Sequence, residues 1–523
     1  MDAEGLLASA AINLGLALVA LSLFSLLKKQ PGNAPVYIPR RMAAGDWGDG
    51  LLPLGHGRLT PSLRWIGAAF RLSEDDVLRR HGLDALVVIR LFKFGCKLRY
   101  LSMVYPIQHI VECMALTITY SLKEEYKEIT RRRIQHLKYH SKRPDQYTIL
   151  VRGIPTCPDH GTYGCYVDHF FSKHYQTYQS YQIVHDIGNI EALQGIVQFE
   201  KIKRWFPPAR AVQLIPGLNS VVTGYLPSMI LNAFIYLVPF AMLGMASFEG
   251  CISNSQKEIK ACNMVFYFLL GNVFFLSVLS GSLLDQIGES FTHPKNIPSH
   301  LASAVSAQSD FFITYILTNG MSGFSLEVLQ FGLLTWQFLK AHSVGHSKEP
   351  YLYGFPYYRV VPIVSLAILI GMVYAVVAPL LLPILLIYFL LGYAVYINQM
   401  EDVYETTYDT CGKYWPNIHH YIFLSVTLMQ ITMIGLFGLK SKPGASFATV
   451  PLLVLNILYN EYSKVRFLPT FHHRPVQVAK ENDELDETEQ ITEGSSDNAV
   501  SAYKPPWMRP TNLEFDSVQP LNL

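Results

Sequence analysis

The stretches VVPIVSLAILIGMVYAVVA (residues 360–378) and LLLPILLIYFLLGYAVYIN (residues 380–398) decide the fold of this chain. Each has 19 residues, and neither contains Asp, Glu, Lys or Arg. A helix rises about 1.5 Å per residue, so about 20 apolar residues cross a hydrocarbon core about 30 Å thick. A helix also pairs its own backbone groups, which lipid cannot do. The two stretches therefore predict two consecutive transmembrane helices.

Other parts of the sequence pass or approach the same test. These stretches are Leu6–Leu27, Tyr225–Phe248, Met264–Ile287, Phe311–Leu339, Tyr421–Leu439 and Phe447–Tyr462. A ninth stretch, Leu101–Leu122, contains polar residues such as Gln108 and Glu112 that are costly in lipid, so its crossing is left open. The predicted fold class is an all-α polytopic membrane protein of about eight to nine helices.

The composition supports a membrane protein and gives no support to an enzyme. Half of the residues are apolar and only 16% are charged. Lys and Arg number 42 against 40 Asp and Glu, so the charge predicts no nucleic-acid partner. Motifs such as GxSxG, HExxH and the P-loop are absent. We therefore predict no catalytic residues and no cofactor.

Charge and composition divide the chain into segments. Residues 1–28 are predicted to form a transmembrane helix, residues 29–100 a cytosolic linker, and residues 101–143 a partial helix with a basic segment. Residues 144–206 are more polar, and YTILVRGIP and GIVQFE alternate like strands around a predicted helix at Tyr166–Tyr178. They predict a small, incomplete cytosolic α/β insert. Residues 207–463 form the main transmembrane domain, and residues 464–523 a disordered tail.

The segment CPDHGTYGCYVDH contains four residues of the types that bind zinc. They are Cys157, His160, Cys165 and His169. Their spacing matches no strong zinc pattern, and the seven cysteines of the chain show no CxxC pair. The sequence favours ordinary loop and helix residues here, so no metal site is predicted.

Polar residues inside the apolar stretches are the candidates for function. Asn272 lies within Met264–Ile287, while Tyr315, Asn319 and Glu327 lie within Phe311–Leu339. An ionised carboxylate at membrane depth costs at least about 2.5 kcal/mol, so Glu327 should face water, a cation or a basic partner. Tyr315 and Asn319 share a helix face, but Glu327 lies about 80° from Asn319 in an unbroken helix.

Gly320 and Gly323 stand between Asn319 and Glu327. A bulge or bend at these glycines would bring Tyr315, Asn319 and Glu327 to one lumen, and glycine weakens a helix enough to permit hinging. The alternative is that the small residues only permit close helix packing and that Glu327 pairs with a lysine such as Lys340. Both interpretations stay open on the residues alone.

Several stretches together resemble one protein family. GLDALVVIRLFKFG, YTILVRGIP and YGFPYYRVVPIVSLAILIGMVYAVVAPLLLP are similar to the plant hyperosmolality-gated, calcium-permeable cation channels (OSCA or CSC-like), which are related to the anoctamin superfamily. The resemblance implies a channel that membrane tension or osmotic stress opens to cations including calcium. It also implies a plasma-membrane location, a homodimer or an assembly with related subunits, and an insert with an RNA-recognition-like fold.

The resemblance also assigns roles within residues 207–463, which become a channel domain. Glu327 in SLEVLQ matches the acidic pore-helix position of the family, and Asn272, Tyr315 and Asn319 are expected beside it along the pore. Gly320 and Gly323 are expected to form the gating hinge.

The sequence departs from the family pattern in two places. After KFGCKLRY the second helix of the family is missing, and after IKRW most of the third pore-side helix is missing. Two other functions therefore remain open. One is a lipid scramblase with a groove between the same helices, and the other is a non-conducting partner of full-length subunits.

Overall fold

The computed structural model describes residues 3–45, 64–103, 110–139, 149, 151, 153–158, 161, 163–175, 178, 181, 237–249, 251, 253–278, 297–335, 337, 352–441, 443–472, 480 and 484. The chain forms two compact units. The first comprises residues 1–133 and 215–473, and the second comprises residues 134–214 and 474–523.

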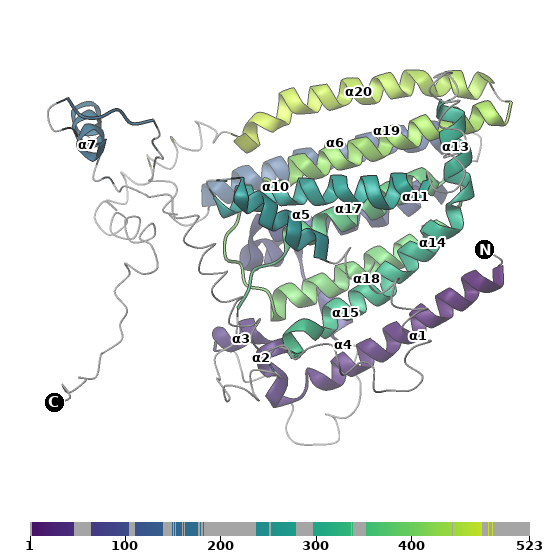
Figure 1. The fold of residues 1–523 in the computed structure, drawn as a ribbon, viewed down its shortest axis with the longest axis horizontal. Helices are drawn as coiled ribbons and strands as arrows, with labels where there is room; N and C mark the ends of the chain where they lie inside the picture. Colours follow the sequence, from purple (N-terminus) through teal and green to yellow (C-terminus); the bar gives the residue numbers. More distant parts are fainter. Residues whose placement is uncertain are drawn as a thin grey trace, which may run out of the picture. The chain divides into compact units, whose positions relative to one another are not determined.

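Long helices that run side by side build the first unit (Figure 1). They are α1 (Ala3–Leu27), α5 (Glu74–Met103), α6 (Ile110–Tyr139), α10 (Asn254–Leu269), α17 (Tyr357–Tyr374), α18 (Leu381–Asp402), α19 (Trp415–Leu439) and α20 (Pro443–His472). Shorter elements join them, namely η1 (Pro31–Asn33), α2 (Ala34–Tyr37), α3 (Pro39–Ala43), α4 (Arg64–Arg71), α11 (Leu276–Val278) and α13 (Ile297–Ala307).

Five helices in the described part of the chain are long and apolar enough to cross a membrane. They cover Ala10–Leu27, Asn254–Val278, Tyr357–Tyr374, Leu381–Asp402 and Trp415–Leu439. The all-α polytopic fold is therefore confirmed. The span predicted at Met264–Ile287 starts ten residues earlier, at Asn254, where the side chain of Ser253 accepts a hydrogen bond from the backbone N–H of Gln256 and caps the helix.

Two other predicted spans differ from the structure. Phe311–Leu339 is not one continuous helix, because Gln330 adopts a φ of 49° and ends α15 (Phe324–Leu329) before helical structure resumes at Phe331. Phe447–Tyr462 is part of the longer α20. Of Leu101–Leu122, residues 104–109 lie outside the described residues, so its crossing of the membrane stays open. Of Tyr225–Phe248, the structure describes an apolar helix from Leu237.

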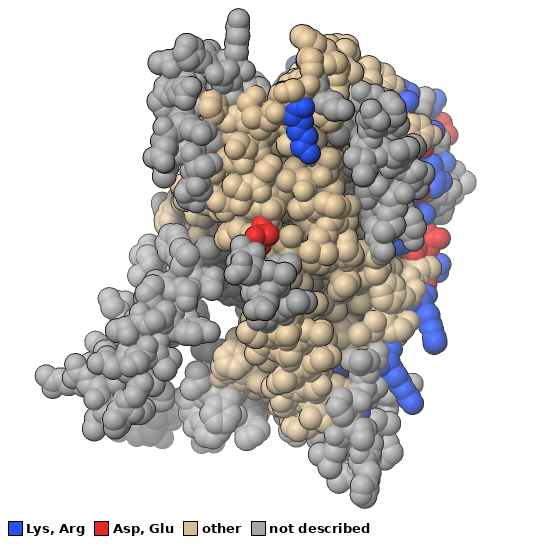
Figure 2. Space-filling model, turned by 90° about the vertical axis from the view of Figure 1, so that its right-hand side faces the viewer, with Lys and Arg blue, Asp and Glu red and all other residues tan. Residues whose placement is uncertain are grey.

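Several helices of the first unit expose apolar side chains. On α1, Ile12, Leu16 and Val19 are more than half exposed, and on α20 Val454 and Leu458 are as well. Figure 2 shows an end of the molecule where the described surface is mostly uncharged and where charged side chains gather along one edge. Such apolar surface suits contact with lipid rather than water.

The segment predicted as a cytosolic linker, residues 29–100, contributes a core helix. Leu86, Val88 and Phe92 of α5 are fully buried, and α5 packs along α18. Gly392 of α18 lies so close to the ring of Phe92 that a Cβ atom would not fit there. Arg90, a charged residue of the same helix, pairs with Glu74 at 2.9 Å and with Glu125 of α6 at 2.7 Å. Burial of its apolar face and pairing of its charges therefore make α5 part of the bundle.

The described residues of the second unit contain one full helix, α7 (Tyr163–His174). This helix confirms the short helix predicted near Tyr166–Tyr178. The described residues of YTILVRGIP carry no strand, and GIVQFE lies outside the described residues. The α/β character of the insert therefore stays a prediction.

Candidate functional site

The candidate pore residues lie on two helices that are interrupted by π-helical turns. One helix runs from α10 through η5 (Leu270–Phe275) to α11 and contains Asn272. The other runs from α14 (Ser309–Leu317) through η8 (Thr318–Gly323) to α15 and contains Asn319. A π-helical turn widens the helix locally and shifts the register of the side chains that follow it. Of the two interpretations that the sequence left open, a bulge at Gly320 to Gly323 is present as the π-helical turn Thr318–Gly323.

A polar residue of α1 holds the η8 turn. Asn13 donates a hydrogen bond from Nδ2 to the hydroxyl oxygen of Thr318 at 3.3 Å, and its Oδ1 accepts one from Ser322 at 2.9 Å. Asn13 is 8% exposed, whereas Thr318 is exposed, so the two bonds are partly buried. A buried amide with hydrogen-bond partners across a helix interface favours one register of the two helices. Asn13 thereby ties Thr318 and Ser322, near the two ends of η8, to α1.

Gly320 sits in η8 where α18 comes closest. A Cβ atom at this position would lie 2.8 Å from Cδ2 of Tyr388. Gly323, at the other end of the turn, has no atom within 4 Å of such a Cβ position. The two glycines therefore differ in role. Gly320 permits close packing of η8 against Tyr388, whereas no neighbouring side chain that the structure describes restricts the backbone at Gly323.

Glu327 lies at the end of the same helix and belongs to a group of polar residues that we call the Glu327 cluster (Glu327, Arg359, Gln399 and Tyr404). Arg359 Nη2 donates to Glu327 Oε2 at 2.7 Å, and the Tyr404 hydroxyl donates to Glu327 Oε1. Gln399 Nε2 donates to the backbone oxygen of Glu327 at 3.0 Å. The Arg359 and Glu327 side chains are only 13% and 11% exposed. The basic partner is thus Arg359, while Lys340 lies outside the described residues.

The Tyr404 hydroxyl stays protonated beside this carboxylate. Burial, and secondly the nearby Glu327 charge, raise the pKa of Tyr404 well above its ordinary value. A protonated hydroxyl can only donate to Glu327, so it stabilises the carboxylate in its ionised form. The cluster therefore gives the Glu327 side chain a basic partner in Arg359 and a hydrogen-bond donor in Tyr404.

The end of α15 is held by two further contacts. The Tyr37 hydroxyl donates to the backbone oxygen of Leu329 at 3.0 Å, which satisfies one of the carbonyl groups that a helix end leaves unpaired. The Tyr353 hydroxyl donates to Gln330 Oε1 at 2.8 Å. Together with the Glu327 cluster, these bonds fix the place where the helix breaks.

Asn272 and Asn319 use their amides within their own helices. Asn272 Nδ2 donates to the Phe268 carbonyl at 3.0 Å, and Asn319 Nδ2 donates to the Tyr315 carbonyl at 3.1 Å. A π-helical turn disturbs the regular backbone ladder, and such bonds satisfy the carbonyls near it. The Tyr315 ring stacks on Phe311 with centroids 6.3 Å apart. These two bonds use the amide nitrogens and not the amide oxygens.

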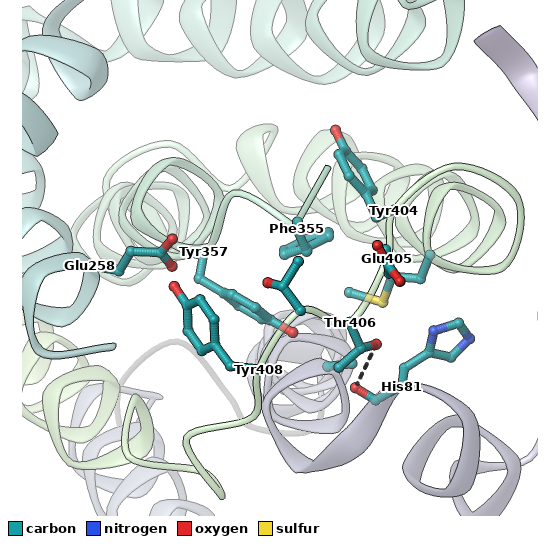
Figure 3. Close-up of a pocket in the computed structure, with 12 residues that line it drawn as sticks. His81, Glu258, Phe355, Tyr357, Tyr404, Glu405, Thr406 and Tyr408 are labelled. Carbon is teal, nitrogen blue, oxygen red and sulfur yellow. Dashed lines mark hydrogen bonds between the residues drawn. The ribbon is translucent and has the colours of Figure 1, made fainter. Parts of the chain in front are cut away.

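A pocket lies beside the Glu327 cluster (Figure 3). Tyr404 contributes to both, since its ring lines the pocket while its hydroxyl donates to Glu327. Across the pocket, the Tyr408 hydroxyl points toward the Glu258 carboxylate. His81 lines the far side, where its backbone oxygen accepts a bond from Thr406 at 3.4 Å. Sequence reasoning missed this pocket because its walls come from four distant parts of the chain.

The sequence is similar to known channel proteins. Residues 187–437 match the family described as "Calcium-dependent channel, 7TM region", and residues 5–151 match the family described as "Late exocytosis, associated with Golgi transport". Hyperosmolality-gated Ca2+ permeable channel 2.5 of Arabidopsis thaliana is 45% identical, with 96% of each chain covered. Channel 2.1 of the same plant is 29% identical, with 93% of this chain and 90% of that protein covered.

The alignment with channel 2.5 also reveals internal gaps. It extends over 683 positions, whereas this chain has 523 residues, so the relative contains internal residues with no counterpart here. This agrees with the missing segments predicted after KFGCKLRY and after IKRW.

Proposed function

This chain belongs to the family of the hyperosmolality-gated Ca2+ permeable channels, and we propose that it is a subunit of a calcium-permeable cation channel opened by osmotic stress or membrane tension. One observation carries the gating part of the proposal. The helix α14–η8–α15 is interrupted by a π-helical turn, and polar contacts hold it at the turn and at its end.

We propose that this helix has two arrangements, one with the polar contacts described above and one without them. In the arrangement described above, Glu327 is neutralised by Arg359 and Tyr404. If the helix moves at η8, the carboxylate leaves Arg359 and meets water and cations. Membrane tension favours the arrangement that occupies more area in the bilayer plane. The shift in the equilibrium depends on the difference in area between the two arrangements.

We propose that Asn272, Tyr315, Asn319 and Glu327 line the hydrated path, with Gly320 and Gly323 as its hinge. Amide, hydroxyl and carboxylate oxygens are the ligands that calcium prefers. Weak, successive oxygen contacts let an ion enter a path and still leave it. The π-helical turns support this role, because the amide oxygens of Asn272 and Asn319 are not used in the bonds to their own helices.

Replacing one carboxylate tests this proposal. Glu327→Gln keeps the side-chain size but removes the charge, so Arg359 loses its ionic partner. We expect stretched membrane patches to open at lower tension and to pass less calcium relative to sodium. Glu405→Gln is the matched control, since Glu405 lies on the nearby pocket and is exposed. Currents identical to those of the unmodified chain would exclude Glu327 from both gate and pore.

The internal gaps favour a second candidate function, that of a non-conducting partner of full-length relatives. A subunit that lacks part of the pore wall could still assemble through its intact helices. Expression of the chain alone and together with a full-length relative separates the two functions. Currents from the chain alone support the channel. Absent currents combined with co-purification of the relative support the partner.

We further propose that the protein resides in the plasma membrane as a homodimer or together with related subunits. A fluorescent tag reports the membrane, and photobleaching steps of single complexes count the subunits. Retention in internal membranes would contradict the location, and single bleaching steps would contradict the assembly.

A further inference from the structure

Three residues with metal-binding side chains come together in the second unit. The Sγ atoms of Cys157 and Cys165 and a ring nitrogen of His169 lie within 4.8 Å of one another. All three belong to the segment that the sequence analysis interpreted as ordinary loop and helix residues. The fourth residue of that segment considered there, His160, lies outside the described residues.

The local backbone explains why these side chains meet. The backbone N–H of Gly161 donates to the Cys157 carbonyl at 2.8 Å, and Gly161 has a φ of 68°, which glycine adopts without strain. This turn reverses the chain just before α7 begins at Tyr163. Cys165 and His169 are four residues apart on α7 and therefore share one face of the helix. The turn places Cys157 against that face.

Two of the distances between the donor atoms are close to those of a tetrahedral zinc site. His169 Nδ1 lies 3.9 Å from Cys157 Sγ and 3.8 Å from Cys165 Sγ. A zinc ion with Zn–S bonds of about 2.3 Å and Zn–N bonds of about 2.0 Å would separate sulfur and nitrogen by about 3.5 Å. The two sulfur–nitrogen distances reach this value after a contraction of a few tenths of an ångström, and the two Sγ atoms lie within 4.8 Å of each other. Small rotations of exposed side chains can supply it, since His169 is exposed and Cys165 is half-buried.

We propose that Cys157, Cys165 and His169 bind a zinc ion, with water or one further donor in the fourth position. Two thiolates and one imidazole select zinc over magnesium or calcium, which prefer oxygen ligands. The ion would tie the Cys157–Gly161 turn to α7. A helix of 12 residues is marginal alone, so this crosslink stabilises the insert. The site is separate from the channel proposal and can be tested without measuring currents.

The test uses the full chain purified in detergent after expression in zinc-supplemented medium. Elemental analysis should find about one zinc per chain, and removing one ligand with Cys165→Ser or His169→Asn should lower this to about one tenth or less. His174→Asn is the matched control on the same helix, because His174 Nδ1 contacts the Phe170 carbonyl at 2.7 Å instead of the cluster. Cys251→Ser is the control for a cysteine of the first unit.

A second measurement needs no variant and guards against misfolding. Replacing zinc by Co2+ should give the intense near-ultraviolet absorption of cobalt–thiolate bonds in the unmodified chain. The proposal is overturned if the unmodified chain shows neither zinc nor this absorption, or if Cys165→Ser retains all the metal. It is also overturned if peptide mapping finds a disulfide between Cys157 and Cys165 in the purified protein.

Discussion

The π-helical turns η5 and η8 have the same backbone form but different surroundings. Asn13 from α1 bonds to both sides of η8, and Gly320 of η8 packs against Tyr388 of α18. In η5, Asn272 is exposed and bonds to a carbonyl of its own helix, and a Cβ atom at Gly271 would meet nothing within 4 Å. Apolar residues hold η5, where Phe274 packs against Phe312 of α14 with ring centroids 5.6 Å apart, whereas polar bonds from another helix hold η8.

From this difference we propose which of the two helices can change its arrangement. A wide turn alone only makes a helix easier to bend. Specific contacts can hold a wide turn in one arrangement. The turn can then switch, because breaking these contacts changes the free-energy difference between the two arrangements. We therefore propose η8 and the helix around it as the gate, and we propose no switching role for η5.

The largest expected effect comes from breaking the ion pair at the end of the η8 helix. Glu327→Ala leaves the Arg359 guanidinium, which is 13% exposed, without its carboxylate. We expect the free energy of unfolding to fall by about 3 kcal/mol, visible as a lower melting temperature in detergent. Adding Arg359→Met should recover much of the loss, because the double variant no longer buries a guanidinium whose Glu327 carboxylate has been removed. Equal melting temperatures for Glu327→Ala and the unmodified chain would contradict the pairing.

The next effect compares the space for a methyl group in η8 with that in η5. Gly320→Ala places a methyl group 2.8 Å from Tyr388, so we expect a loss of about 1–3 kcal/mol in the free energy of unfolding. Gly271→Ala adds the same methyl group to η5 without a clash, and the higher helix propensity of alanine should stabilise the protein by up to about 1 kcal/mol. Thermal unfolding of both variants measures the difference. Similar shifts for both would mean that α18 does not confine η8.

The smallest effect concerns the hydrogen bonds from α1. Asn13→Ala and Ser322→Ala should each destabilise the protein, and a double-mutant cycle should give a coupling free energy of about 0.6 kcal/mol. The matched cycle of Asn13→Ala with Asn272→Ala should give none, because Asn272 bonds within its own helix. A coupling free energy of the same size in both cycles would show that it does not come from the hydrogen bond between Asn13 and Ser322.

The sequence predicted the helix class correctly, and it offered a bulge at Gly320 to Gly323 as one of two interpretations. Uncharged runs such as residues 360–378 have few alternatives to a transmembrane helix, and Gly320 with Gly323 weakens one helix at a definite place. The partner of Glu327 was not predicted. Arg359 is 32 residues away and lies just outside an apolar run, so no spacing rule connects the two residues.

The core position of α5 was hidden by its charges. Arg90 and Lys93 give the segment the composition of a linker, and only the folded bundle provides Glu74 and Glu125 as their partners. The cluster on α7 was hidden for a different reason. The spacing from Cys157 to Cys165 matches no common zinc pattern, and the positive φ of Gly161 that closes the turn cannot be read from composition alone.

The most direct measurement of the central claim compares two glycine variants in membrane patches under controlled tension. Gly323→Ala in η8 and Gly271→Ala in η5 each add one methyl group where nothing lies within 4 Å, so packing is unchanged in both. If η8 is the hinge of the gate, Gly323→Ala shifts the half-maximal current to higher tension, while Gly271→Ala leaves it where the unmodified chain has it. Identical tension curves for the two variants, or a shift with Gly271→Ala alone, would contradict this account.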